Sequence, residues 1–258
     1  MVRIATTPIT GFMAACTKVA AFGALLRVAY VAIPAARWDW QPAVGVVAIL
    51  TMVLGSVVAI VQADVKRMLA YSSIAHAGFI LVGILAMDRT GVSGVLFYLL
   101  AYGFTTIGAF ALVSLVRSGG EGGVGGEATH LSQWAGLGRK SPLLAGLFTL
   151  FLLAFAGIPL TSGFTGKYAV FSAAVAHATW GPTLVIVGVL ASAVAAFFYV
   201  RVIVLMYFSE PSGDGTIVAS PGVLTVVAVG LGALATLVLG VLPSWALDVA
   251  SSSSVFLP

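Results

Sequence analysis

The sequence predicts an all-α polytopic membrane protein with about seven transmembrane helices, one of them discontinuous. Hydrophobic residues make up 60% of the 258 residues and charged residues only 8%, whereas soluble domains carry roughly 25% charged residues. The apolar runs are continuous and reach the length of about 20 residues that one helical crossing needs. They do not alternate over short strands, as a transmembrane β-barrel requires. These observations exclude a soluble domain and favour a helical membrane protein.

Seven apolar regions follow one another, and we interpret residues 1–258 as a single transmembrane domain. The predicted spans are 8–33, 43–61, 66–87, 91–117, 142–178, 181–208 and 220–242. The fifth region is too long for one straight helix, because at about 1.5 Å per residue it would extend well beyond a hydrocarbon core of about 30 Å. It is either two short crossings or one crossing broken in the middle, and composition alone leaves both open.

The stretch AGIPLTSGFTGKYAVF places helix-disrupting residues in the middle of this fifth region. Proline cannot donate a backbone hydrogen bond, and glycine lowers helix propensity. Unwound backbone at membrane depth persists only where protein or water satisfies its polar groups, and transporters use such broken helices to build ion sites. We therefore expect a break near 157–166. The residues assigned to it are Gly157, Pro159, Gly163 and Gly166.

Two lysines lie deep within the predicted spans, where a central lysine costs about 2.5–3.5 kcal/mol on insertion scales. Lys18 lies near the middle of the first span, and Lys167 follows the predicted break. We interpret both as buried amines that carry protons. The alternative for Lys18 is a side chain that reaches a lipid headgroup or a partner carboxylate. The alternative for Lys167 is an interfacial anchor beside a proline kink.

The stretch DVKRMLAYSSIAHAGFI opens the third span with Lys66 at its edge and carries His76 ten residues further on. At about 1.5 Å per residue, His76 lies roughly 15 Å from that edge, near mid-membrane. Histidine titrates near neutral pH, so with the hydroxyls of Tyr71, Ser72 and Ser73 it suits a proton relay. The alternatives are a histidine bonded to a neighbouring helix and, for Lys66, a solvated helix end.

Loop charges predict the orientation in the membrane. With the fifth region as one broken crossing, one side carries Arg3, Lys66, Arg67, Arg117, Arg139 and Lys140, and the other carries Arg37 and Arg89. The positive-inside rule makes the first side cytoplasmic, so the N-terminus is cytoplasmic and the C-terminus outside. Residues 118–141 are then a cytoplasmic loop, interpreted as a flexible glycine segment followed by a short surface segment.

No cofactor, metal or nucleic-acid site is predicted in this chain. Cys16 is the only cysteine, so a cysteine-only metal site is excluded. The loop contains a literal GxGxxG at 120–125, but this motif binds nucleotides only between a strand and a helix, and neither flank fits. The net charge of +4 is typical of loops that face anionic lipid rather than nucleic acid.

Five stretches together carry a family resemblance. They are TKVAAFGALLRV, DVKRMLAYSSIAHAGF, YLLAYGFTTIGAF, GLGRKSPLLAGLFTLFLLAFAGIPLTSGFTGKYAVF and FFYVRVIVLMY. With them, nearly the whole chain resembles the C-terminal half of subunit N of bacterial NADH-quinone oxidoreductase (respiratory complex I), an antiporter-like proton-translocating subunit. Related subunits of multisubunit cation/proton antiporters share part of the pattern.

The resemblance implies the second half of an antiporter-like inverted-repeat fold, with the fifth region as one broken helix. It implies that Lys18 links two half-channels, that Lys167 lies beside the exit path, that His76 lies on a central hydrophilic axis, and that Lys66 is a recurrent lysine of less defined role. It also implies that NADH, FMN, iron-sulfur clusters and quinone belong to partner subunits. The partners would be other membrane-arm subunits and the lipid of a bacterial inner (plasma) membrane.

We therefore expect a proton-translocating membrane-arm subunit that couples electron transfer from NADH to quinone to proton pumping and carries no redox chemistry itself. One alternative is a subunit of a multisubunit cation/proton antiporter. Another is an inactive or assembly-only truncated fragment. The acid-lysine pair of the family's first repeat has no counterpart in these residues, so a separate N-terminal half is a further expected partner.

Overall fold

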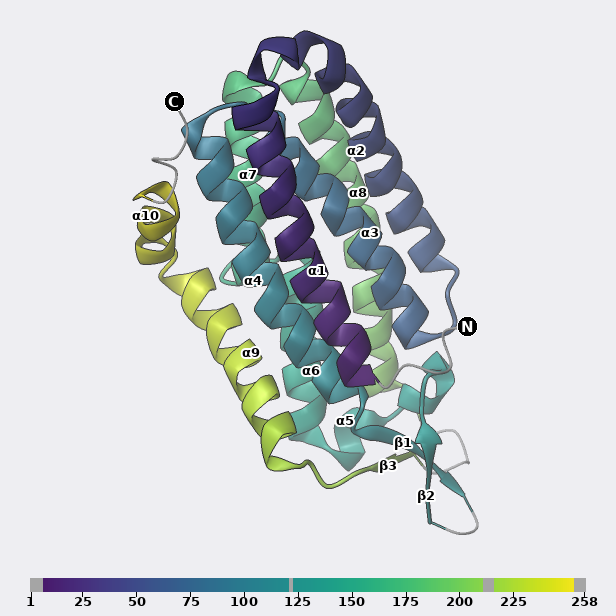
Figure 1. The fold of residues 1–258 in the computed structure, drawn as a ribbon. Coiled ribbons are helices and arrows are strands. Elements are labelled where there is room, and N and C mark those ends of the chain that lie inside the picture. Colours follow the sequence, from purple (N-terminus) through teal and green to yellow (C-terminus); the bar gives the residue numbers. More distant parts are fainter. Residues whose placement is uncertain (1–6, 121–122, 211–215, 253–258) are drawn as a thin grey trace.

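The computed structural model describes residues 7–120, 123–210 and 216–252, and helices dominate this part of the chain (Figure 1). The α-helices are α1 (Thr7–Arg27), α2 (Arg37–Ile60), α3 (Val65–Ile84), α4 (Arg89–Val113), α5 (Leu137–Lys140), α6 (Pro142–Ala156), α7 (Ser162–His177), α8 (Gly181–Phe208), α9 (Val223–Val241) and α10 (Ser244–Ser252). Short turns of π-helix (Val28–Ala32) and 3-10 helix (Pro34–Ala36 and Leu131–Trp134) join them.

Six stretches of the described residues are long and apolar enough to cross a membrane. They are Thr7–Ala32, Pro34–Ile60, Val65–Ile84, Arg89–Val113, Gly181–Phe208 and Val223–Val241. The fifth predicted region, 142–178, is divided between α6 and α7, and α6 is a shorter apolar helix. The predicted all-α polytopic membrane class is therefore confirmed.

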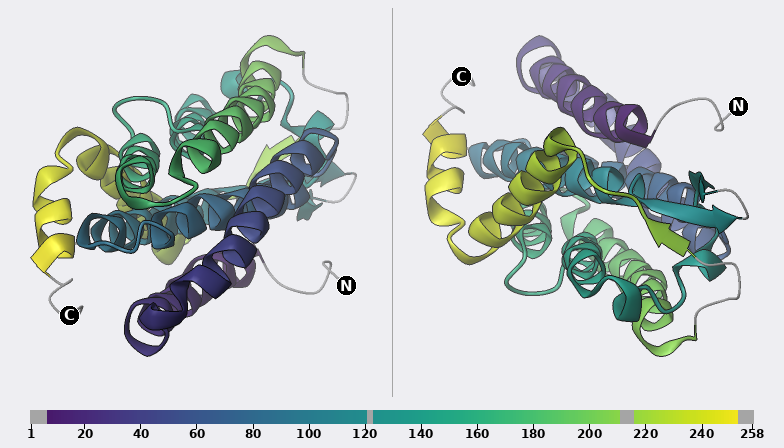
Figure 2. Two further views of the ribbon diagram at one scale, coloured as in Figure 1. Left: turned by 90° about the horizontal axis from the view of Figure 1, so that it is seen from above. Right: turned by 90° about the horizontal axis from the view of Figure 1, so that it is seen from below.

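The helices α3 and α4 form the centre of the bundle. In their most apolar windows 67% and 72% of the residues are buried, against 22–33% in the other four spans, so the outer helices turn most of their apolar surface outward. Seen along the bundle, α1 lies on one side of α4 and α7 on the other (Figure 2). The helix α2 packs on α3 and α8, and α9 packs on α4.

A small antiparallel sheet, which the sequence did not predict, lies at one end of the bundle. Its strands are β1 (Val116–Gly120), β2 (Gly123–Glu127) and β3 (Thr216–Val218), in the order β2-β1-β3. The chain leaves α4 and α8 at the same end, so β1 and β3 can pair there and satisfy backbone groups that a free loop would leave to solvent. The prediction of a flexible glycine segment at the start of 118–141 was therefore wrong for the described residues.

The remainder of that loop is anchored rather than lying on the surface. Trp134 is fully buried, its Nε1 donates to the carbonyl oxygen of Ala128 at 2.8 Å, and its ring lies 4.8 Å from that of Phe148 on α6. An indole buried with a satisfied N–H is a favourable anchor. This contact holds the loop against α6.

The helix break lies between Ala156 and Ser162, so it is narrower than the predicted 157–166. Gly157 has a φ of 81°, its N–H donates to Ala154, and the next N–H, of Ile158, donates to Leu153 at 3.1 Å. This is a Schellman motif, which favours glycine because a Cβ is costly at positive φ. Pro159 follows at a position where the helix cannot continue.

Gly163 and Gly166 were assigned to the break, and this was wrong, because both lie inside α7. A Cβ on Gly163 would lie 1.8 Å from the carbonyl oxygen of Ala154, and one on Gly166 would lie 3.0 Å from the Tyr98 ring. The two glycines therefore permit close packing of α7 on the end of α6 and on α4.

The Trp134 anchor gives a test of the fold. Trp134→Ala should lower the free energy of unfolding by about 3–5 kcal/mol, the usual loss for a buried large side chain. Trp180→Ala is the control, since Trp180 is 61% exposed and its loss should change stability by no more than about 0.5 kcal/mol. Thermal unfolding in detergent measures both, and equal effects would contradict the anchoring role.

Candidate functional site

Three of the four predicted proton-carrying residues gather around α4 in the interior of the bundle. Lys18 comes from α1, His76 from α3 and Lys167 from α7. Two tyrosines of α4, Tyr98 and Tyr102, contact this group. Their spacing of four residues places both on one face of the helix, so a single helix face contacts side chains from the surrounding helices.

Lys18 is half-buried and directed toward α3 and α4. Its Nζ donates to the carbonyl oxygen of Ser73, to the Ser73 hydroxyl at 2.6 Å and to the Tyr102 hydroxyl at 3.3 Å. The same nitrogen lies 4.6 Å from the centre of the Tyr102 ring, a cation–π distance. Within the described residues its partners are therefore neutral oxygens and a ring.

His76 is 3% exposed and surrounded by aromatic rings. Its Nδ1 lies 2.7 Å from the Tyr98 hydroxyl, and the tautomer decides which of the two donates. The rings of Tyr102, Phe79 and Phe155 lie 4.9–5.6 Å from the imidazole. The tight packing holds the imidazole in one position, with a hydroxyl as its hydrogen-bond partner.

Lys167 binds the end of the helix that precedes the break. Its Nζ donates to the carbonyl oxygens of Phe155 at 3.1 Å and Ala156 at 2.9 Å. The last carbonyls of a helix have no partner within it, and the negative end of the helix dipole favours a cation there. The nitrogen also lies 4.9 Å from the centre of the Phe79 ring. The break therefore supplies acceptors for an amine that is only 6% exposed.

Single aromatic rings connect the three residues. Tyr102 contacts both Lys18 and His76, and Phe79 contacts both His76 and Lys167. His76 thus lies between the two lysines. A cavity of about 10 Å³, lined by His76, Tyr98 and Ser162 among others, adjoins the imidazole, and a cavity of this size holds about one water molecule.

A larger groove leads from Lys167 to the face of the bundle between α7 and α8. It has a volume of about 620 Å³, and Gly157, Lys167, Tyr168 and Ser192 contribute to its lining. The amine can therefore be reached from one side of the bundle, whereas His76 lies behind it in the closed interior.

Sequence reasoning missed the tyrosines that complete this site. Tyr98 and Tyr102 contact the imidazole directly, and the Tyr199 hydroxyl of α8 is hydrogen-bonded to Ser72 beside it. The spacing of Tyr98 and Tyr102, four residues apart on one helix face, is a signal that could have found two of them. Tyr199 is separated from Ser72 by 127 residues, and no local pattern predicts that contact.

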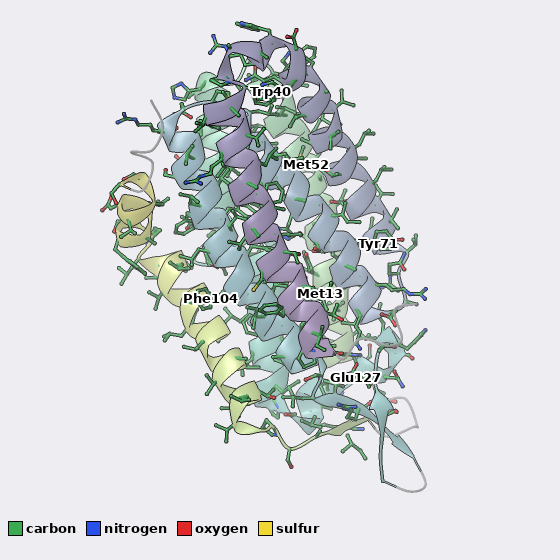
Figure 3. All side chains as sticks on the ribbon, in the orientation of Figure 1. Met13, Trp40, Met52, Tyr71, Phe104 and Glu127 are labelled. Atoms are coloured by element: carbon green, nitrogen blue, oxygen red, sulfur yellow. The ribbon has the colours of Figure 1, made fainter. Side chains whose placement is uncertain are left out.

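Lys66 does not join this group. Its amine pairs with the carboxylate of Glu127, which also accepts from the Thr7 hydroxyl and lies 3.9 Å from Arg117. Figure 3 places Glu127 at the end of the bundle, near the start of α1. The Lys66 side chain is 13% exposed, so it is neither a solvated helix end nor a neighbour of His76. Glu127 holds α1, α3 and β1 together.

The pKa of Glu127 reflects two opposing effects. Burial by itself raises the pKa of this carboxyl, but hydrogen bonds from Lys66 and Thr7 and the charges of Lys66 and Arg117 outweigh burial, so the pKa lies below the usual value. The carboxylate therefore stays ionised to a lower pH than an ordinary glutamate.

Comparison with known proteins finds a matching family and similar proteins that belong to it. A sequence model described as "NADH:quinone oxidoreductase/Mrp antiporter, TM" matches residues 2–195. NADH-quinone oxidoreductase subunit N 3 of Streptomyces griseus is 63% identical over 252 residues, which cover 98% of this chain and 44% of that protein. The chain thus spans about half the length of the curated relatives it matches. The predicted resemblance to about half of subunit N is confirmed.

Solved structures agree in fold. A chain of respiratory complex I from Thermus thermophilus with bound aureothin is 32% identical, with a TM-score of 0.78, over 95% of this chain and 51% of that one. A chain of the Mrp complex from Dietzia sp. has a TM-score of 0.82 over 98% of this chain and 53% of that one, at 21% identity. The second likeness shows the fold alone.

The Glu127 cluster predicts a pH-dependent contribution to stability. A carboxyl whose pKa is lowered on folding stabilises above its ordinary pKa of 4.5, and the contribution is lost as pH falls through the lowered pKa. At neutral pH Glu127→Gln should cost about 1–3 kcal/mol in free energy of unfolding, and the difference from wild type should vanish in strong acid.

Thermal unfolding in detergent at several pH values measures this difference. The control is Glu210→Gln, at an exposed residue just beyond α8, which should follow the wild type at every pH. A Glu127→Gln deficit that persists unchanged in acid would contradict the assigned ion pairs.

Proposed function

Because this chain belongs to the NADH:quinone oxidoreductase/Mrp antiporter transmembrane family, we propose that it is a proton-translocating subunit of the membrane arm of an NADH-quinone oxidoreductase. Electron transfer from NADH to quinone would take place in partner subunits, which would hold the FMN, iron-sulfur clusters and quinone. This chain would contribute proton pumping across a bacterial inner membrane. Other membrane-arm subunits are its proposed partners.

The arrangement of Lys18, His76 and Lys167 supports this proposal most directly. Two amines flank a buried imidazole, and each is one aromatic ring away from it. Ionisable groups at membrane depth are costly and are characteristic of ion and proton paths. The 63% identity to a subunit N agrees with the same function.

The neutral partners of the two amines suit a change of protonation state. Lys167 binds two backbone carbonyls, and Lys18 binds hydroxyls and a carbonyl. In the described residues neither amine is paired with a carboxylate that would hold its charge. A change of charge in a neighbouring subunit can then alter the protonation of each amine, since one pKa unit corresponds to only about 1.4 kcal/mol.

The proposed path runs from Lys18 through His76 to Lys167. The Tyr102 hydroxyl at Lys18 and the Tyr98 hydroxyl at His76 offer donors and acceptors along the way. Water in the small cavity beside His76 would carry the proton between groups that are not in direct contact. Lys167 would then be the last of these groups before release.

The proposed orientation places the N-terminus in the cytoplasm and the C-terminus outside. Lys66, Arg117, Arg139 and Lys140 belong to the end of the bundle that carries the sheet and α5 (Figure 1), and positive charge gathers in cytoplasmic loops. Arg3, assigned to the same side, lies outside the described residues.

Substitution of Lys167 tests the function. In the assembled complex in membrane vesicles, Lys167→Ala should lower NADH-driven proton pumping at least tenfold, because the buried proton carrier is lost; this corresponds to about 1.4 kcal/mol in the barrier. Lys140→Ala, an exposed lysine at the end of the bundle, is the control. Unchanged pumping together with unchanged quinone reduction in Lys167→Ala would refute the proposed role.

The Tyr98 hydroxyl gives a finer test of the path. A hydrogen bond of this kind contributes about 0.5–1.5 kcal/mol net, so Tyr98→Phe should slow pumping by up to about tenfold while the subunit still assembles. Tyr207→Phe on α8 is the matched control. If both variants pump at the same rate, the Tyr98 hydroxyl has no part in the path.

A further inference from the structure

The turn at the helix break contains a strained residue that its own side chain does not hold in place. Leu160 has a φ of 71°, in the left-handed region that non-glycine residues rarely adopt. Its side chain is 71% exposed, so packing of that side chain does not explain the conformation. Such conformations persist only where the surrounding structure enforces them, and the support must come from backbone contacts.

The end of α9 provides such a backbone contact. A Cβ on Gly240 would lie 2.4 Å from the carbonyl oxygen of Leu160 and 2.6 Å from the Cα and carbonyl carbon of Thr161. Atoms do not approach a Cβ so closely, so a side chain here would force one backbone to move. The bare backbone of α9 therefore rests directly on the strained turn.

The helix α9 is in turn fixed on α4. Leu239, beside Gly240, is buried in a cluster with Phe97, Ala101 and Ala246. One turn earlier, the Thr236 and Thr105 hydroxyls are 3.0 Å apart and hydrogen-bonded. Figure 1 shows α9 lying along α4 toward α10. The helix that touches the turn is thus anchored to the same helix that contacts His76.

We propose that α9 holds the turn of the helix break in place and that Gly240 is a positioning residue for Lys167. This inference rests on the proposed function. The turn joins the carbonyls of Phe155 and Ala156 to α7, which carries Lys167. Moving the turn moves these acceptors relative to the amine. Gly240 acts through the turn and does not itself contact Lys167.

The test compares Gly240→Ala with Gly230→Ala in the complete complex in membrane vesicles. Gly230 belongs to the same helix, and a Cβ there meets nothing within 4 Å. We expect Gly240→Ala to lower NADH-driven proton pumping several-fold at an unchanged amount of subunit and to change the pH profile of pumping. Gly230→Ala should match the wild type.

A second variant separates positioning from simple destabilisation. Glycine tolerates both left-handed and other conformations, so Leu160→Gly lets the turn move away from the added methyl group. We expect Leu160→Gly combined with Gly240→Ala to restore most of the pumping, or of the assembly if Gly240→Ala alone fails to assemble. Absence of any rescue would overturn the proposal.

The remaining outcomes of this experiment distinguish failure of the positioning role from failure of the proposed function. The positioning role of Gly240 is refuted if Gly240→Ala pumps like Gly230→Ala. It is also refuted if Gly240→Ala lowers pumping only in proportion to the amount of subunit and leaves the pH profile unchanged. Lys167→Ala is measured alongside. If Lys167→Ala lowers pumping while Gly240→Ala does not, the positioning role of Gly240 is refuted and the proposed function stands. If Lys167→Ala also pumps normally, the proposed function is refuted.

Discussion

The hydrogen bonds from Lys167 to the last two carbonyls of α6 are the interaction on which the interior of this protein depends. An amine and two free carbonyls inside a membrane are each costly alone, because lipid satisfies neither. Together they satisfy one another. The Schellman turn at Gly157 creates the free carbonyls, and the restart of the helix at Ser162 brings the lysine back to them. The break and the lysine are therefore one structural unit.

The ionisable side chains beside α3 and α4 in the interior of the bundle have neutral groups as their partners. His76 is hydrogen-bonded to a phenol hydroxyl. The two lysines contact serine and tyrosine hydroxyls, a backbone carbonyl and the face of an aromatic ring. A buried ion pair would hold its charge in a fixed state and would carry a desolvation penalty that its attraction repays only with excellent geometry. Neutral partners leave the protonation of each amine responsive to its surroundings, which is what a proton carrier needs.

The cluster around Glu127 at the end of the bundle differs from the interior, because its charged groups are paired with groups of opposite charge. There a carboxylate binds a lysine and a hydroxyl and faces an arginine, and these contacts lower its pKa and favour the ionised form. Such a site holds its charge and its geometry. It ties the first turn of α1, the start of α3 and the sheet into one unit, and this explains why Lys66 stands apart from the interior residues despite lying on the same helix as His76.

The sequence by itself determined the membrane class, the order of the spans, the existence of a break after Ala156 and the choice of Lys18, His76 and Lys167 as candidate site residues, because length, hydropathy and rare buried charges are local properties. The tertiary structure alone decided the partners. That Gly163 and Gly166 serve packing, that Lys66 finds Glu127, that β3 pairs with β1 and that Gly240 meets Leu160 all depend on contacts between residues distant in the chain. Periodicity and propensity describe one helix at a time, and they carry no information about which helix lies beside it.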